Sequence, residues 1–142
     1  MLELVVNNGI AAMSQQAIDK VRTLESLVKK LPQTPIQTYH CLHGGMYART
    51  VFVPKGVLIT GVHIRVETIL ISDGNATVYV DGTPMVLRGR QVIPAAAGRK
   101  QAFYAESDLW LTMLFPTKAE TVEEAEAEFT DEPDMLQTRR QP

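Results

Sequence analysis

Three things are scarce in this chain of 142 residues: it has one cysteine, three histidines and no excess of basic side chains. The single cysteine, Cys41, cannot form an intramolecular disulfide, so the fold does not depend on an oxidising compartment. Lys and Arg number 14 against 16 Asp and Glu, which leaves no cationic field for a nucleic-acid backbone. We therefore expect no nucleic acid among the partners.

Long apolar runs are missing as well. No stretch approaches the roughly 18 consecutive apolar residues of a membrane span, and the first residues lack the basic and apolar regions of a signal peptide. The sequence thus predicts neither a membrane partner nor export. Apolar residues still make up 45% of the chain, an ordinary value for one globular core.

Composition divides the chain into an N-terminal arm and helix (residues 1–35), a β-rich part (36–117) and an acidic tail (118–142). In the first part, apolar residues recur three and four positions apart, which predicts an amphipathic helix from the N-cap Ser14 to Leu31, ended by Pro32. Its apolar stripe consists of Ala17, Val21, Leu24, Val28 and Leu31. The stripe either packs on its own domain or serves as a docking arm on a neighbouring chain.

The middle part changes to a period of two, with turn residues every eight to twelve positions, which is typical of antiparallel strands in a sandwich or barrel. The predicted strands are Tyr47–Val53, Leu58–Ile71, Thr77–Val80, Met85–Leu87, Gln91–Pro94, Gln101–Tyr104 and Leu109–Phe115. The fold class is therefore all-β.

The last part is rich in acidic residues. Thr121-Val122-Glu123-Glu124 matches a capping box and predicts a short helix, and eight acidic residues lie between Glu120 and Asp134. Because this segment has little apolar surface to bury, we expect a solvated tail, or an arm that a partner orders.

The strand predicted at Leu58–Ile71 is the one that could carry chemistry. Alternation places His63, Arg65 and Glu67 on one face and the apolar residues Val62, Ile64 and Val66 on the other. By alternation alone, the branched apolar face belongs to the core and the polar face to solvent.

A resemblance reverses that expectation. Gly61-Val62-His63, Glu67 and Gly74 approach the first motif of the cupins, in which a glycine precedes a His-x-His pair, a glutamate and a further glycine. The spaced motifs resemble a family of small cupin-like proteins encoded by tailed bacteriophages, over about four-fifths of the chain. They are Leu31-Pro32-Gln33, His40, Gly45-Met46-Tyr47-Ala48-Arg49, Pro54-Lys55-Gly56, Gly61-Val62-His63, Ser72-Asp73-Gly74, Pro94, Gly98-Arg99-Lys100 and Tyr104-Ala105.

The resemblance implies one cupin or jelly-roll-type antiparallel β-barrel with an N-terminal amphipathic helix and a short acidic C-terminal helix. His63 then points into the barrel, and the apolar strip on the opposite face points outward, where it needs a cover. The expected assembly surface consists of Val21, Leu24, Val28, Leu31, Val62, Ile64 and Val66.

The ligand positions implied by the resemblance are largely replaced. Gly61 stands at the first histidine position and Gln101 at or near the later one, which leaves His63 and Glu67. Arg65 would repel a divalent cation and suits an ion pair with Glu67. We therefore expect no metal, no cofactor and no catalytic residue. The candidate pocket consists of His63, Arg65, Glu67, Gln101 and Tyr104.

Two minor signals complete the survey. His40 and His43 precede a Gly-Gly turn and are more typical of hydrogen-bonded structural histidines than of metal ligands. Gly98-Arg99-Lys100 predicts a turn with two cations, which is at most a weak anion site.

The leading prediction is a non-catalytic structural component of a bacteriophage particle, either a head decoration or cement protein or a tail accessory protein. It would reside in the virion, assembled in the host cytoplasm, and its partners would be other phage structural proteins or further copies of itself. The alternative is a cupin that binds a small molecule, or a metal-dependent isomerase or dioxygenase with a degraded metal site.

Overall fold

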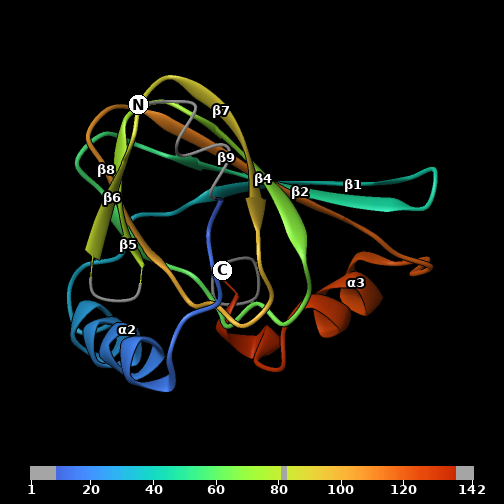
Figure 1. Cartoon of the computed structure of the whole chain (residues 1–142), viewed down its shortest axis with the longest axis horizontal. Helices are drawn as coiled ribbons and strands as arrows, with labels where there is room; N and C mark the ends of the chain where they lie inside the picture. The colour runs from blue at the N-terminus through green and yellow to red at the C-terminus, as the bar shows by residue number, and fades with distance from the viewer. Residues whose placement is uncertain (1–8, 81–82, 137–142) are drawn as a thin grey trace.

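The computed structural model describes residues 9–80 and 83–136, which form two facing antiparallel sheets with a helix near each end of the chain (Figure 1). The larger sheet has the strand order β1-β2-β9-β4-β7 and the smaller one β3-β8-β5-β6. The elements are α2 (Gln15–Val28), β1 (Gln37–His43), β2 (Met46–Val53), β3 (Leu58–Thr60), β4 (Thr68–Asp73), β5 (Ala76–Val80), β6 (Thr83–Leu87), β7 (Arg90–Ala95), β8 (Ala102–Ala105), β9 (Leu109–Pro116), α3 (Val122–Phe129) and the 3-10 turn η1 (Pro133–Met135).

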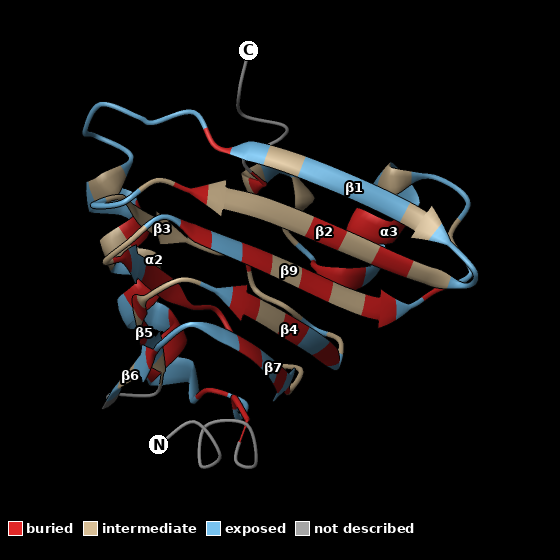
Figure 2. Cartoon of the chain, turned by 90° about the horizontal axis from the view of Figure 1, so that it is seen from above, coloured by how far each residue is buried: buried red, intermediate tan, exposed pale blue. Residues whose placement is uncertain are grey.

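The prediction of an antiparallel all-β core with one helix on each side of it is confirmed. The first strand, β1, was not predicted, because exposed polar residues occupy most of it and it is an edge strand paired only with β2. Gly44 and Gly45 form the turn between these two strands with φ of 59° and 76°, a region that glycine adopts without strain. The resulting hairpin extends beyond the barrel (Figure 2).

The prediction of one continuous strand over Leu58–Ile71 is wrong. The chain leaves the small sheet after β3 and enters the large sheet at β4. The backbone of Ile64 in the connection forms hydrogen bonds with Gly98 and Arg99, and Arg65 N–H donates to the carbonyl of Phe129. The connection therefore crosses from one sheet to the other at the end of the barrel where the C-terminal segment lies.

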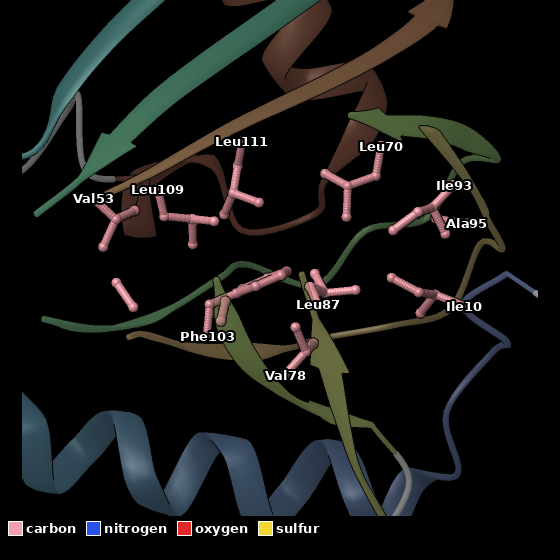
Figure 3. Packing of buried hydrophobic residues seen from close by; sticks show 12 residues of the cluster. Ile10, Val53, Leu70, Val78, Leu87, Ile93, Ala95, Phe103, Leu109 and Leu111 are labelled. Carbon is pink, nitrogen blue, oxygen red and sulfur yellow. The ribbon is translucent and has the colours of Figure 1, made fainter. Parts of the chain in front are cut away.

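The main core fills the space between the two sheets (Figure 3). Strands β4, β7 and β9 of the large sheet alternate between buried and more exposed residues, so that every second side chain points away from solvent, toward the core. Val53, Leu109 and Leu111 face Val78 and Phe103 across this space. Burying each such side chain contributes about 1.5 to 3 kcal/mol.

Helix α2 begins where the sequence predicts, since the side chain of Ser14 accepts a hydrogen bond from the backbone N–H of Ala17 at 3.1 Å. It ends at Val28 rather than Leu31, and Leu31 remains 61% exposed. Ala17 and Val21 of the predicted stripe are buried against the barrel, in a cluster that includes Val80. The docking-arm interpretation is corrected: this helix packs on its own domain, while Leu24 and Val28 are only half-buried.

The C-terminal segment, residues 122–136, is not a solvated tail. Thr121 caps α3 by accepting from the backbone N–H of Glu124 at 3.1 Å, as the capping box predicts. Phe129 is 1% exposed and packs in a second cluster with Tyr47 and Phe115. The segment has few apolar residues, but they lie on one side of it and are enough to hold it on the barrel. The last residues of the predicted tail, 137–142, lie outside the described part of the chain.

This segment also covers the apolar strip for which the sequence predicts an outward position. Val62 is 6% exposed and belongs to the same cluster as Phe129, with Ile64 and Val66 packed against it. The strip is thus covered by the chain itself and is removed from the predicted assembly surface. Among the described helices, none is long and apolar enough to cross a membrane.

Candidate functional site

A cavity of about 140 Å³ lies inside the barrel, between the two sheets. Most of its wall consists of aliphatic and aromatic side chains from both sheets, and Phe129, Met135 and Leu136 of the C-terminal segment complete it. Four polar side chains interrupt this apolar wall. They are Arg49, Thr60, Arg99 and Gln101.

Arg99 is the most unusual of them, because it is only 3% exposed. Its guanidinium donates to the carbonyl of Ala96 at 2.6 Å, to Thr68 Oγ1 at 2.7 Å and to Gln101 Oε1 at 3.2 Å. All three acceptors are neutral, and none of the ion pairs formed within residues 9–80 and 83–136 involves Arg99. Burial lowers the pKa of Arg99 to about 10, while Glu67 opposes this shift, so the group stays charged at neutral pH.

Gln101 lies beside Arg99 and is 5% exposed. Its Oε1 accepts from Arg99, whereas its Nε2 is buried with no hydrogen-bond partner in the described part of the chain. A buried amide donor without an acceptor costs about 1 to 3 kcal/mol. The cavity therefore presents a buried cation and an unused donor side by side, a combination that suits an anionic acceptor.

Arg49 differs from Arg99 in that its charge is compensated within the chain. Its Nη1 donates to Glu126 Oε2 at 3.1 Å, and its guanidinium carbon lies 5.9 Å from the centre of the Phe129 ring. Both side chains of the ion pair are buried. Arg49 thus holds helix α3 on the barrel, whereas Arg99 is the cavity arginine that forms no ion pair in the described residues.

The residues at the predicted metal-ligand positions do not fit a divalent cation. Gly61 and Gln101 do line the cavity, held together by the Gly61 N–H donating to the Gln101 carbonyl at 2.8 Å. The polar groups at this place are the guanidinium of Arg99, which repels a cation, and the side-chain amide of Gln101, which binds one weakly. In the described parts of the chain, no three His, Cys, Asp or Glu side chains are close enough together to hold a metal ion.

Of the predicted pocket residues, only Gln101 lines this cavity. His63 lies outside it, with Nδ1 3.5 Å from Asp131 Oδ1, so the prediction that this face points into the barrel is corrected. The Arg65 side chain donates to the carbonyls of Ala127 and Glu128. It forms no ion pair with Glu67 in the described residues.

The two other predicted pocket residues also lie elsewhere. Glu67 accepts a short hydrogen bond from the backbone N–H of Ala97. Tyr104 is 41% exposed on the outside of the small sheet, where it pairs with Leu58. Glu67 is displaced because the predicted strand breaks after Thr60. Tyr104 points outward because its neighbour on β8, Phe103, lines the cavity and successive side chains of a strand alternate.

The buried ammonium of Lys100 joins both ends of the chain to the barrel. Its side chain has no exposed surface, and Nζ lies 3.1 Å from Glu25 Oε2 of helix α2 and 2.8 Å from Glu132 Oε1 of the C-terminal segment. Glu132 also pairs with Arg22 at 2.8 Å and accepts from the backbone N–H of His63. Burial alone would raise the pKa of the Glu132 carboxyl. Hydrogen bonds from both cations and from that N–H outweigh burial and hold the pKa at about 2.

The remaining histidines have structural surroundings. His40 Nδ1 lies 2.8 Å from the hydroxyl of Tyr47, and burial lowers the pKa of His40 and raises that of Tyr47. His43 and Cys41 are exposed on strand β1. The hydrogen bond of His40 agrees with the structural interpretation of this pair.

Sequence reasoning missed Arg49 and underrated Arg99. The signal for Arg49 was available, since Tyr47, Arg49, Val51 and Val53 share the inward face of a predicted strand, and a cation in that series is unusual. A signal for Arg99 was also available, since it stands two positions before Gln101, which begins a predicted strand, and residues two apart share one face of a strand. The sequence predicts a turn with two cations that is at most a weak anion site, whereas the structure buries both side chains.

No protein-family model matches this chain, and no curated protein sequence matches it either. Solved structures do. A cupin superfamily protein of Desulfitobacterium hafniense superposes with a TM-score of 0.50 at 11% identity, covering 65% of this chain and 88% of its own. The plu4264 protein of Photorhabdus luminescens gives a TM-score of 0.51 at 9% identity, covering 62% of this chain and 80% of its own.

A cupin 2 conserved barrel domain protein of Leptotrichia buccalis gives a TM-score of 0.50 at 12% identity, covering 62% of this chain and 44% of its own. At these identities the likeness concerns the fold. The fold of this chain is a cupin-type barrel.

Proposed function

We propose that this protein is a non-catalytic cupin that binds a small carboxylate with an apolar body inside its barrel. One observation carries the proposal: Arg99 is buried in the cavity wall and forms no ion pair with any described carboxylate, beside the amide donor of Gln101 that has no described partner. Buried charges in proteins are normally paired, because an isolated one is costly. A ligand carboxylate would accept from both side chains and neutralise the charge.

The size and lining of the cavity define the rest of the ligand. A volume of about 140 Å³ is close to that of an engineered apolar cavity of roughly 150 Å³ that binds benzene. The rest of the wall is apolar and includes residues such as Phe103 and Leu111. The ligand class is therefore a carboxylate on a body of about the size of a benzene ring.

The lining also supports a binding role over a catalytic one. Among the described residues that line the cavity, arginines are the only side chains with an ionisable acid or base group, and a guanidinium does not serve as a proton acceptor in proteins. A general base or an activated nucleophile therefore has no candidate within the wall of the cavity. The cavity can hold and orient an anion.

Titration calorimetry with sodium benzoate as the probe tests this proposal. We expect saturable binding to the wild-type protein. We expect Arg99→Met to weaken it by about tenfold or more, because a hydrogen bond to a charged group contributes about 1.5 to 3 kcal/mol and 1.4 kcal/mol is tenfold in affinity. Arg88→Met is the matched control, since that side chain is 56% exposed and lies outside the cavity.

Two results would contradict the proposal. One is an absence of saturable binding for benzoate and for a branched aliphatic carboxylate of similar size, up to several millimolar. The other is equal affinity of the wild-type and Arg99→Met proteins, with circular dichroism showing both folded. Benzyl alcohol, which lacks the charge, should bind more weakly than benzoate to the wild type and about equally to both proteins.

A structural role in a tailed bacteriophage particle is the second candidate. The spaced motifs shared with small phage-encoded cupins support it, and so does the replacement of the imidazole positions by Gly61 and Gln101. A barrel that binds a ligand without converting it is compatible with such a role. Mass spectrometry of purified particles should find this chain in fixed proportion to the major capsid protein, and its absence from particles would refute this candidate.

A further inference from the structure

The outer face of the five-stranded sheet is apolar, and within residues 9–80 and 83–136 neither helix covers it. Strand pairing places the side chains of alternate residues on this side, so that Phe52 lies beside Trp110, Leu114 beside Ile69, and Ile69 beside Pro94. We call it the outer sheet face. Its large apolar side chains include Tyr39, Phe52, Ile69, Val92, Trp110 and Leu114.

These side chains are exposed to a degree that is unusual for their type. Tyr39 and Val92 are 50% exposed, Ile69 is 44% exposed and Trp110 is 42% exposed. Both helices lie on the opposite side of this sheet (Figure 1), and the view from above shows its five strands with neither helix in front of them (Figure 2). A contiguous apolar face of this kind marks an interaction surface.

We propose that the outer sheet face binds the same face of a second copy of this chain, forming a two-fold symmetric dimer. A self-complementary face must not place like charges opposite each other. The described side chains of this face carry one negative charge, Asp73, and one positive charge, Arg90, which stand opposite each other in the register of β4 and β7 at one end of the face. The rest of the face is neutral and therefore meets its own copy without repulsion.

The centre of the face is also suited to losing its water. Thr50 and Thr112 are its central polar residues, and their hydroxyl oxygens lie 2.7 Å apart, within hydrogen-bond distance. Each thus has a partner within the chain when water is excluded, which limits the desolvation cost. Trp110 contacts Phe52 with ring centres 4.8 Å apart and Tyr39 at 6.1 Å, which forms a preordered aromatic group next to this centre.

The extent of the face agrees with what a stable dimer needs. Five strands about 4.8 Å apart, rising about 3.3 Å per residue, make a face of roughly 24 by 20 Å. With its side chains standing out, it offers an area of the order of the roughly 800 Å² per partner in a standard interface. Two sheets of this size stack with their strands within about 30° of each other.

The central strand of the face, β9, is the place to test this arrangement. We place the two-fold axis between the two stacked faces and along β9, so that each outward residue of this strand meets the same residue of its partner, and Leu114 of one chain lies near Leu114 of the other. Leu114→Lys and Leu114→Glu should each weaken the dimer by about a hundredfold or more, because like charges then meet across the axis. Mixing the two variants should restore it, since opposite charges then meet.

Sedimentation velocity over a hundredfold range of protein concentration measures these outcomes. We expect a dimer for the wild type, monomers for each Leu114 variant and a heterodimer for their mixture. Val86→Lys and Val86→Glu are matched controls, because Val86 is 46% exposed on the small sheet, and they should leave the dimer unchanged. A monomeric wild type would overturn the proposal, as would a dimer that survives the Leu114 substitutions. Binding of a monomeric wild type to phosphatidylcholine vesicles would assign the face to lipid instead.

Discussion

Replacing Lys100 with methionine is expected to lower the free energy of unfolding by about 3 to 5 kcal/mol, the usual cost of removing one partner of a buried ion pair. The ammonium is fully buried, and two carboxylates, those of Glu25 and Glu132, depend on it. Methionine fills a similar volume, so the loss is mainly electrostatic. The two carboxylates would then face each other without a cation between them.

Urea denaturation followed by circular dichroism measures this loss. Lys118→Met is the matched control, because Lys118 is exposed, and it should change the free energy of unfolding by less than about 0.5 kcal/mol. The triple variant Lys100→Met, Glu25→Gln, Glu132→Gln should be more stable than Lys100→Met alone, since neutral amides replace the stranded charges. A loss below about 1 kcal/mol for Lys100→Met would show that the carboxylates do not depend on this ammonium.

Replacing Phe129 with alanine is expected to cost about 3 to 5 kcal/mol, the range for deleting a buried aromatic side chain. Phe129 is 1% exposed, its ring stacks at 6.2 Å on that of Tyr47, and its edge meets Phe115 at 6.0 Å. It is the largest apolar contact by which the C-terminal segment holds the barrel. It also lines the cavity, so its removal enlarges the proposed ligand site.

Thermal denaturation, together with limited proteolysis of the C-terminal segment, measures this effect. Leu27→Ala is the control, because Leu27 is 57% exposed on helix α2, and a surface substitution of this kind changes stability by about 0.5 kcal/mol or less. We expect cleavage within residues 122–136 to become faster in Phe129→Ala and to stay unchanged in Leu27→Ala. Equal proteolysis of all three proteins would contradict the role assigned to this side chain.

The fold could be predicted from the sequence where a local signal existed. Alternation and turn residues located most strands, and Ser14 and Thr121 located both helix starts, because these signals act within a few residues. The strand predicted over Leu58–Ile71 failed because its alternation is genuine but is satisfied by the C-terminal segment instead of by a sheet partner. The sequence does not reveal which distant segment of the chain covers an apolar face such as that of Val62, Ile64 and Val66.

The candidate site was harder to predict, for a related reason. Gln101 was found because the motif spacing placed it in the barrel. His63 was misplaced because its neighbours Val62 and Ile64, on the opposite face of this segment, are the residues that line the cavity. Arg99 and Lys100 look like a cationic surface turn, and their burial depends on groups distant in the sequence: Thr68 for Arg99, and two carboxylates for Lys100. A local pattern carries no information about such partners.

The two ion pairs of Lys100 also determine which partial openings of the molecule keep its ammonium neutralised. Its two carboxylates lie 75 residues before it and 32 residues after it, on segments that have separate contacts with the barrel. If the C-terminal segment lifts away, Glu25 still neutralises the ammonium; if helix α2 lifts away, Glu132 does so. Simultaneous departure would leave a bare buried charge and is disfavoured. An opening of the C-terminal segment, which lines the cavity, would therefore leave α2 docked and the ammonium paired.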